Sequence, residues 1–469
     1  MAFSLTKEEI IRRASTPGFD KTYRENQIIV VFTEKPNAEN IYSAKEFLIA
    51  SMRKPTILTP ADITAKTCDQ CDCPLVLFEG IDIETVIVTE GVKAGSGTSP
   101  GKAVGELSLN YYISLPYEHW PPQQGFKNKF SESADEGKKK VVVAVLDTGL
   151  DAGLVDPRYL WEKDGSLPGA HCYEFIQNGW NFVDKSELID GQDPSNYHDD
   201  HIGKHGSLVS QFIINEFIEL KKNYVRIMPL KTHSSSGKGD LYGVICAIHV
   251  AMAHGVNIIN ASWGFANILG LSLTYLDELI SKRLAEKGIL FITASGNFPR
   301  GDEKIQIDIQ GIDTSNKSGI LQLRNVEYNN FWPASLSSKS KIVITTTTTD
   351  GVKISPAQNF SEQFVDLGVG AHHEMQFDVP FSENSDEYAP LRGSSFATAI
   401  ATGIIGANCS VKWFKKDISK DNIFKEFARR NPIFFKSPIL IYNKKLAHYW
   451  IRNGCIINKR KKVISRATS

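Results

Sequence analysis

Residues 141–150 read VVVAVLDTGL, and this stretch decides the fold. The apolar run 141–146 shows no polar alternation, which is typical of a β-strand covered on both faces. Such strands occur mainly in parallel sheets that carry helices on each side. The run ends at Asp147, a carboxylate directly after a buried strand. Because ligands collect beyond the carboxyl ends of parallel strands, Asp147 is the first candidate for a functional residue.

Further apolar runs repeat this pattern along the chain. They span 225–230, 256–262, 288–295 and 341–349. Helical spacing, with apolar residues three and four apart, fills 207–220, 240–255 and 273–288. Strands that alternate with helices predict an α/β fold, with a doubly wound, mostly parallel sheet and helices on both of its faces.

The N-terminal region has a different character and predicts a small α+β domain. Strand-like segments at 27–33, 74–78 and 84–88 and a helical segment at 38–52 precede a Gly-rich loop at 91–105. The polar, lysine-rich stretch 123–140 has the composition of a linker. We therefore predict four regions: an N-terminal α+β region at 1–122, the linker at 123–140, the α/β domain at 141–432, and a C-terminal extension with a basic tail at 433–469.

Composition argues against a general attraction to polyanions. Lys+Arg and Asp+Glu both count 53, so we expect neither nucleic acid nor a membrane surface as a partner. The basic run 459–462 has the composition of a solvated tail. The N-terminus MAFSLTKEEIIRRASTPGF lacks the apolar core of about 7–15 residues that a secretory signal needs. No stretch approaches the roughly 18 apolar residues of a membrane span. We expect a cytoplasmic protein.

The seven cysteines are an odd count for a chain without an export signal, so we expect mostly reduced thiols. Cys68, Cys71 and Cys73 form a C-x-x-C-x-C cluster. Three thiolates are metal ligands in principle, but a closed zinc site needs a fourth ligand and no histidine lies nearby. Reduced cysteines are the favoured interpretation of this cluster, and metal binding is the alternative.

Three polar motifs besides Asp147 fall at element boundaries. HGSLVS places His205 at the start of a helix, TASGN places Asn297 just after a strand, and RGSSFATA places Ser395 at the start of a helix of small residues. These blocks, in the order Asp, His, Asn, Ser, resemble those of the subtilisin-like serine peptidases (the subtilase family, peptidase family S8). The resemblance covers roughly residues 138–430.

This resemblance implies a serine endopeptidase with Asp147, His205 and Ser395 as its catalytic triad and Asn297 in the oxyanion hole. A serine hydroxyl is a poor nucleophile until a base removes its proton. An imidazole titrates near neutral pH and suits that role. The aspartate would hold the tautomer of the ring, and the chain would cleave proteins or peptides through an acyl-enzyme intermediate.

The segment NASWG (260–264) resembles the family's strand that pairs with substrate beside the first specificity pocket. On this interpretation Ser262, Trp263 and Gly264 form one substrate-binding edge, and Gly237 and Gly239 form the opposite one. The alternative interpretation is a core strand followed by a turn.

The chain departs from the family pattern at four places. Ser394 stands where the family usually has Thr, Phe396 where it has Met, Ser207 where it favours Thr, and Leu208 where it favours His. None of these changes removes a catalytic group, and the register of G-S-S-F-A selects Ser395 over Ser394 as the nucleophile. The alternative function is a catalytically weak or inactive protein of this fold that binds peptides.

The resemblance also bears on cofactors and regulation. It implies no required cofactor, although family members often bind calcium through loop carboxylates, for which Asp151, Asp156 and Asp184 are the candidates. Many members carry a small α+β propeptide that blocks the cleft, and residues 25–115 have a fitting size. Self-inhibition by this region is one expectation, and an attached domain that recognises a partner or substrate is the rival.

Overall fold

In the computed structural model, the described residues are 22–52, 58–68, 71–83, 104–115, 139–163, 176–184, 196–267, 273–298, 307, 311–350, 353–354, 357–361, 363–370, 377–380, 388–391, 393–409, 411–415, 418–429, 449–452 and 455–458.

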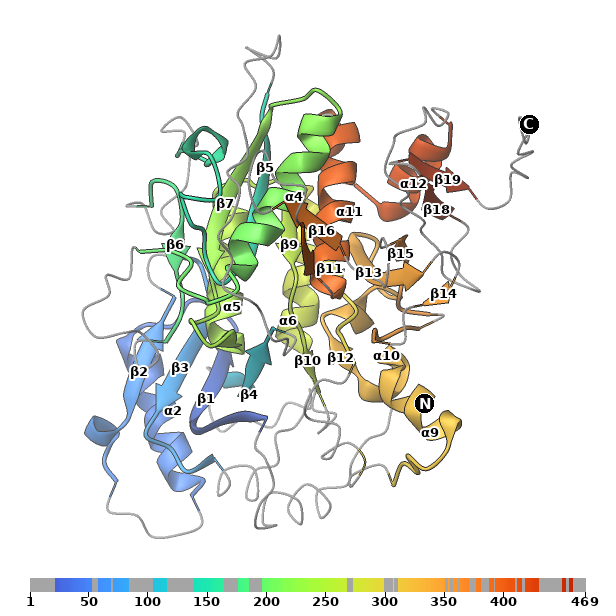
Figure 1. Cartoon of the computed structure of the whole chain (residues 1–469). Coiled ribbons are helices and arrows are strands. Elements are labelled where there is room, and N and C mark those ends of the chain that lie inside the picture. Colours follow the sequence, from blue (N-terminus) through green and yellow to red (C-terminus); the bar gives the residue numbers. More distant parts are fainter. Residues whose placement is uncertain are drawn as a thin grey trace, which may run out of the picture.

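A mostly parallel sheet forms the centre of the chain (Figure 1). Its strand order is β14-β13-β11-β9-β5-β7-β6, and β15 also pairs with β13. The strands are β5 (Val141–Asp147), β6 (Trp180–Asn181), β7 (Val225–Lys231), β9 (Ile258–Ala261), β11 (Leu290–Ala294), β13 (Val343–Asp350), β14 (Lys353–Ile354) and β15 (Leu367–Gly370). All neighbours are parallel except β13 and β14. The predicted α/β class is confirmed.

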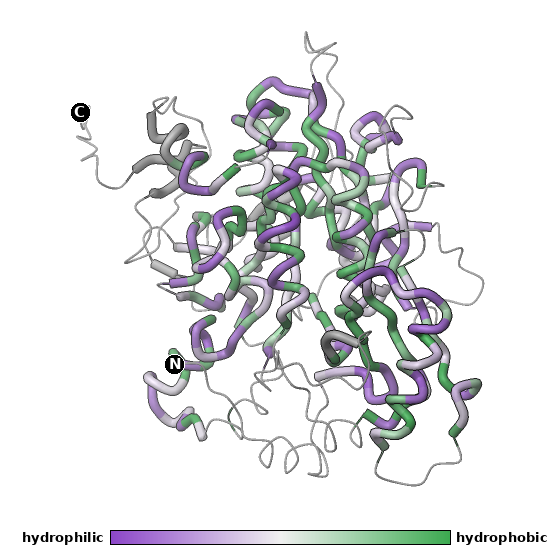
Figure 2. The backbone as a smooth tube through the Cα atoms, turned by 180° about the vertical axis from the view of Figure 1, so that it is seen from behind, coloured by the Kyte–Doolittle hydropathy of each residue, from purple (hydrophilic) through white to green (hydrophobic). Residues whose placement is uncertain are grey.

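Helices cover this sheet. They are α4 (His205–Glu219), α5 (Leu241–Ala253), α6 (Thr274–Glu278), α7 (Leu284–Lys287) and α11 (Ser394–Asn408), with a π-helical segment at Leu279–Arg283 joining α6 to α7. α4 and α11 pack against each other and against the central strands (Figure 1). Seen from behind, hydrophobic positions run along the strands and helices through the middle of the molecule, and many hydrophilic ones lie at outer turns (Figure 2). The apolar runs in the sequence therefore mark the core.

Short elements lie beside the sheet. β10 (Phe265–Ala266) comes between β9 and β11, and α9 (Lys317–Arg324), α10 (Val326–Asn329) and β12 (Phe331–Trp332) follow β11. β10 pairs with β12 in antiparallel fashion. The remaining elements are β16 (Phe377–Pro380), β17 (Tyr388–Leu391), α12 (Lys420–Arg429), β18 (Tyr449–Arg452) and β19 (Cys455–Asn458).

An antiparallel sheet forms the N-terminal domain, in the order β2-β3-β1-β4. Its elements are β1 (Tyr23–Phe32), α2 (Ala38–Ala50), β2 (Thr64–Thr67), β3 (Leu75–Glu79) and β4 (Val104–Ser114). The edge strand β4 continues onto β8 (Lys238–Asp240), which precedes α5. The predicted strand 84–88, residues 123–138 of the predicted linker and the basic run 459–462 lie outside the described residues.

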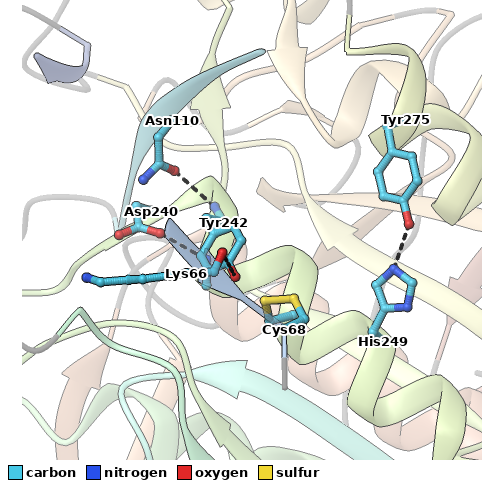
Figure 3. Close-up of a disulfide and its surroundings, with 9 residues drawn as sticks. Lys66, Cys68, Asn110, Asp240, Tyr242, His249 and Tyr275 are labelled. Atoms are coloured by element: carbon cyan, nitrogen blue, oxygen red, sulfur yellow. Dashed lines mark hydrogen bonds between the residues drawn. A yellow bond between two sulfur atoms is a disulfide. The ribbon is translucent and has the colours of Figure 1, made fainter. Parts of the chain in front are cut away.

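A disulfide joins this domain to α5. Cys68 and Cys246 are bonded, with their Cα atoms 5.7 Å apart (Figure 3). Cys71 is also disulfide-bonded, whereas Cys73 and Cys409 are buried thiols. The expectation of reduced thiols is therefore wrong for Cys68, Cys71 and Cys246, because the chain brings distant cysteines within bonding reach. Cys68 and Cys71 are therefore not available as thiolate ligands for a metal, which leaves one thiol in the C-x-x-C-x-C cluster. The cysteines also give no argument for a reducing compartment.

In the part of the chain that the structure describes, no helix has the length and apolar character that a membrane crossing requires.

Candidate active site

Asp147 and His205 form a buried hydrogen bond at the carboxyl edge of the sheet. Asp147 is the last residue of β5 and His205 is the first residue of α4, and both side chains are fully buried. His205 Nδ1 lies 2.7 Å from Asp147 Oδ1. The same oxygen accepts the Thr148 N–H at 2.7 Å. A carboxylate bound to Nδ1 places the ring proton there, which makes Nε2 the basic nitrogen.

The charge state of Asp147 follows from competing effects. Burial raises the pKa of this carboxyl, but attraction to His205, the hydrogen bond to its ring and the Thr148 N–H together hold the pKa below its ordinary value. Asp147 is therefore ionised at neutral pH, which lets it hold the proton on His205 Nδ1.

Two glycines explain why the Asp147 and His205 motifs have their form. A Cβ built on Gly206 would lie 2.4 Å from the Gly149 carbonyl oxygen, so no larger residue fits beside His205. Gly149 has φ +112°, a backbone conformation that residues other than glycine rarely adopt. Thr148 Oγ1 accepts the Gly206 N–H at 2.9 Å. The two motifs are thus joined through backbone as well as through the Asp147–His205 pair.

The acidic pair before the His205 motif supports the start of α4. Asp199 Oδ2 accepts the Ser207 N–H at 3.0 Å and the Ser207 hydroxyl at 2.7 Å. Asp200 forms an ion pair with the buried Lys231 at 2.6 Å. The sequence did not predict these contacts, although two adjacent carboxylates six and five residues before His205 were a usable signal.

His233 is a second buried imidazole near the pair. The Thr232 and His233 N–H groups both donate to the Asp147 carbonyl oxygen, at 2.8 and 3.2 Å. Burial lowers the pKa of His233 to about 3 against the opposing pull of Asp147. Its ring is neutral at physiological pH and adds no charge beside Asp147. Nothing in the sequence around His233 distinguished it from a packed core histidine.

The Asn297 side chain is fixed by the residue before Ser395. Asn297 Oδ1 accepts the Ser394 N–H at 2.9 Å and the Ser394 hydroxyl at 3.0 Å. A backbone N–H can only donate, so the oxygen of the Asn297 amide must face Ser394. The amide nitrogen is then the donor that this side chain can offer to a ligand.

Ser395 lies in the first turn of α11, where its side chain contacts one predicted substrate edge. Its hydroxyl donates to the Ser262 carbonyl oxygen at 2.9 Å, and the Ser262 hydroxyl donates to the Ser395 carbonyl oxygen at 3.0 Å. The next residue, Phe396, places its ring 5.5 Å from the His205 ring. The start of α11 therefore touches both the substrate edge and the His205 ring.

The two predicted substrate edges face a segment of the chain's own N-terminal domain. Ser114 lies opposite Lys238 of β8 and also opposite Gly264. The Leu115 N–H donates to the Gly237 carbonyl oxygen at 2.9 Å. Gly239 lies opposite Ile113 in the same ladder. Trp263 is buried beneath its edge, with its ring 6.3 Å from the His233 ring.

Polar contacts hold this segment in place (Figure 3). The Tyr242 N–H donates to Asn110 Oδ1 at 3.0 Å, and the Tyr242 hydroxyl donates to the Lys66 carbonyl oxygen at 2.9 Å. Arg24 forms an ion pair with Asp240 at 3.0 Å, and both side chains are at most 10% exposed. These contacts lie on the same side of the molecule as the disulfide, so the N-terminal domain is docked at several points.

The three calcium candidates are each engaged with a cation of the chain. Asp151 pairs with Lys204, Asp156 with Arg158, and Asp184 with Lys66. No cluster of three or more acidic, histidine or cysteine side chains that could hold a metal occurs among the described residues.

Comparison with solved structures gives the fold. A cold-adapted subtilisin-like serine proteinase is 18% identical, with 61% of this chain and 80% of that chain covered and a TM-score of 0.36. The epidermin leader peptide processing serine protease EpiP from Staphylococcus aureus is 14% identical, with 88% of this chain and 95% of that chain covered and a TM-score of 0.50. At these identities the likeness to EpiP concerns the fold alone.

Sequence comparison gives the family. No curated protein matches the chain. Residues 138–417, which are more than half of the 469 residues, match the Subtilase family, peptidase S8. The chain therefore belongs to the subtilase family of serine peptidases.

Proposed function

We propose that this chain is a serine endopeptidase in which Ser395 is the nucleophile, His205 the general base and Asp147 the group that orients the base. The observation that carries the proposal is the fully buried 2.7 Å contact between His205 Nδ1 and Asp147 Oδ1. Ser395 and Phe396, at the start of α11, connect this pair with the predicted substrate edge.

In the proposed reaction, the Ser395 hydroxyl turns from the Ser262 carbonyl toward His205. His205 Nε2 takes the hydroxyl proton as Oγ attacks the carbonyl carbon of the scissile bond. The tetrahedral intermediate collapses when its C–N bond breaks, and His205 gives the proton to the leaving amine. This leaves an ester on Ser395, which a water molecule hydrolyses after His205 takes one of its protons.

The proposed oxyanion hole has two donors. One is the Asn297 amide nitrogen, whose orientation follows from the bonds between Asn297 Oδ1 and Ser394. The other is the Ser395 N–H at the N-terminus of α11, where the helix dipole favours negative charge. Such preorganised donors stabilise the developing oxyanion more than the ground-state carbonyl.

We further propose that the N-terminal domain restrains this activity. Its residues 112–115 lie along the edges on which an extended substrate would pair, so a substrate must displace them. Ile113 is fully buried in this ladder, whereas Ser114 is exposed. Ile113→Ala should therefore weaken docking and accelerate covalent labelling of Ser395, and Ser114→Ala is the matched control that should not. Equal labelling rates in both variants and the wild type would contradict the restraint.

The nucleophile is tested with an alkyl fluorophosphonate, which reacts with an activated serine. Wild-type chain should carry the label on Ser395, located by peptide mass spectrometry, and Ser395→Ala should carry none. Ser394→Ala should still be labelled, because the backbone N–H of residue 394 continues to hold Asn297. Absence of label in both the folded wild type and the folded Ile113→Ala variant, whose N-terminal domain should dock less tightly, would exclude the peptidase and favour the alternative of a peptide-binding protein.

A further inference from the structure

We propose that Phe331 closes the pocket for the substrate side chain immediately before the scissile bond, and so restricts that position to glycine, alanine and serine. This inference rests on the proposed peptidase function and specifies its substrate class. It assigns to Phe331 a role in specificity that the sequence alone did not suggest, since residues 301–330 and the strand after them carry no recognisable motif.

The register of the docked segment locates this substrate position. Ser114 lies opposite Gly264 in antiparallel orientation. In an antiparallel pair, each step forward along one strand is a step backward along the other. In a peptide bound in this register, the residue two positions after the one opposite Gly264 therefore lies opposite Ser262. The Ser262 carbonyl oxygen lies 2.9 Å from Ser395 Oγ. The residue opposite Ser262 is therefore the one whose carbonyl group Ser395 would attack.

The side chain of that residue must enter between two glycine segments. Gly264 belongs to the substrate edge, and Gly296 immediately precedes the oxyanion donor Asn297. These are the two backbone walls that flank the attacked carbonyl. Because both walls are glycine, only backbone atoms limit the width of the slot between them. A slot of this kind can receive the substrate side chain that precedes the scissile bond.

The ring of Phe331 already occupies this slot. A Cβ built on Gly264 would lie 2.3 and 2.5 Å from Phe331 Cε1 and Cζ. A Cβ built on Gly296 would lie 2.7 and 2.9 Å from the same ring. One ring edge thus fills the space that a Cβ on either glycine would need, and a second large side chain cannot enter without moving the ring.

The ring is firmly held in this position. Phe331 opens β12 and pairs with Ala266 of β10. It is 5% exposed and packs in a separate apolar cluster. The other buried members of this cluster are Ala266, Val326, Ala334 and Val365, with Phe364 packed against them. The opposite wall is fixed as well, because Asn359 donates from its side chain to the Ser295 carbonyl oxygen and from its backbone to the Gly296 carbonyl oxygen, both at 3.0 Å.

The experiment compares two peptidyl diphenyl phosphonates that differ only at the residue before the phosphorus, which is alanine in one and phenylalanine in the other. Each reacts at Ser395 Oγ, where an O–P bond forms as phenoxide leaves. The ratio of their labelling rates is measured on the full chain. The fraction of molecules with an accessible cleft cancels in this ratio, so restraint by the N-terminal domain does not affect it.

In the wild type the alanine probe should react at least about tenfold faster, as expected when a pocket excludes a bulky group. Phe331→Ala should lower this preference by about tenfold or reverse it. Phe364→Ala is the matched control, since it removes a ring from the same cluster without opening the slot, and its ratio should equal that of the wild type.

Two outcomes would overturn the inference alone: equal rates for both probes in a wild type that the fluorophosphonate labels at Ser395, or an unchanged ratio in Phe331→Ala. If the fluorophosphonate fails to label Ser395 and neither phosphonate reacts, in the wild type and in Ile113→Ala alike, the proposed peptidase function fails and the specificity role fails with it. The fluorophosphonate carries no side chain for this pocket, which is why it separates the two cases.

Discussion

Removal of the Cys68–Cys246 disulfide should cost this protein a large part of its stability. The bond joins the end of β2 to α5 across 178 residues of sequence. The double variant Cys68→Ala/Cys246→Ala removes the crosslink without leaving an unpaired thiol. Both measurements below use Ser395→Ala as background, so that cleavage by the proposed nucleophile cannot shorten the chain during unfolding.

The magnitude follows from the length of the closed loop. For a separation of 178 residues, the entropy that a crosslink removes from the unfolded chain corresponds to about 5 kcal/mol at 25 °C. Each thiol truncated to alanine adds roughly 1 kcal/mol for lost burial. Since Cys68 and Cys246 are 2% and 3% exposed, this second contribution applies to both residues.

Guanidinium unfolding followed by tryptophan fluorescence gives the free energy of unfolding. Cys409→Ala is the matched control, because Cys409 is a buried thiol outside any crosslink and its truncation reports the loss of packing alone. The double variant should lose about 5 kcal/mol beyond twice the loss of the control. A loss no larger than twice that of the control would refute the reasoning. Native protein that is unfolded without reductant and then alkylated at Cys68 and Cys246 would refute it as well, because the two sulfurs would not have been bonded.

Three further predictions follow from particular contacts. Asn297→Ala should slow fluorophosphonate labelling of Ser395 by about 100-fold, since one oxyanion donor contributes about 3 kcal/mol, and an unchanged rate would remove Asn297 from the site. Burial lowers the pKa of His249 from 6.5 to about 4, so between these two pH values only the unfolded state binds the proton and the free energy of unfolding falls on acidification. His249→Gln should therefore reduce the slope of unfolding free energy against pH by about 1.4 kcal/mol per pH unit in this range. Equal slopes in the variant and the wild type would contradict this prediction. A chain with a protease recognition site inserted within 123–138, once cut there, should run as one species on non-reducing gels and as two fragments with reductant. Two fragments without reductant would argue against the disulfide link between the N-terminal domain and α5.

The sequence predicts the sheet well because its signal is local. The run 141–146 corresponds to β5, and the runs at 225–230 and 341–349 correspond to β7 and β13. Strands buried on both faces must be apolar throughout, so composition alone reveals them. Asp147 is the last residue of β5 and Asn297 lies three residues after the end of β11, and parallel strands bring their ends to one edge.

Features that depend on distant partners were not predictable. Cys68 and Cys246 lie far apart in sequence, and cysteine count carried no information about which side of α5 would face the N-terminal domain. Phe331 reads as an ordinary apolar residue until the fold sets it between Gly264 and Gly296. The same holds for Ser394, whose contacts with Asn297 arise only when the start of α11 meets the end of β11.

The central claim is that Ser395 Oγ and His205 Nε2 act on the same carbonyl group. A peptidyl chloromethyl ketone with alanine before the reactive group tests it directly, because Oγ must add to the ketone while Nε2 displaces chloride, which links both residues to one molecule. Mass spectrometry should find His205 alkylated in the wild type and unmodified in Ser395→Ala. An unmodified His205 in a wild type whose Ser395 accepts the fluorophosphonate would contradict the account.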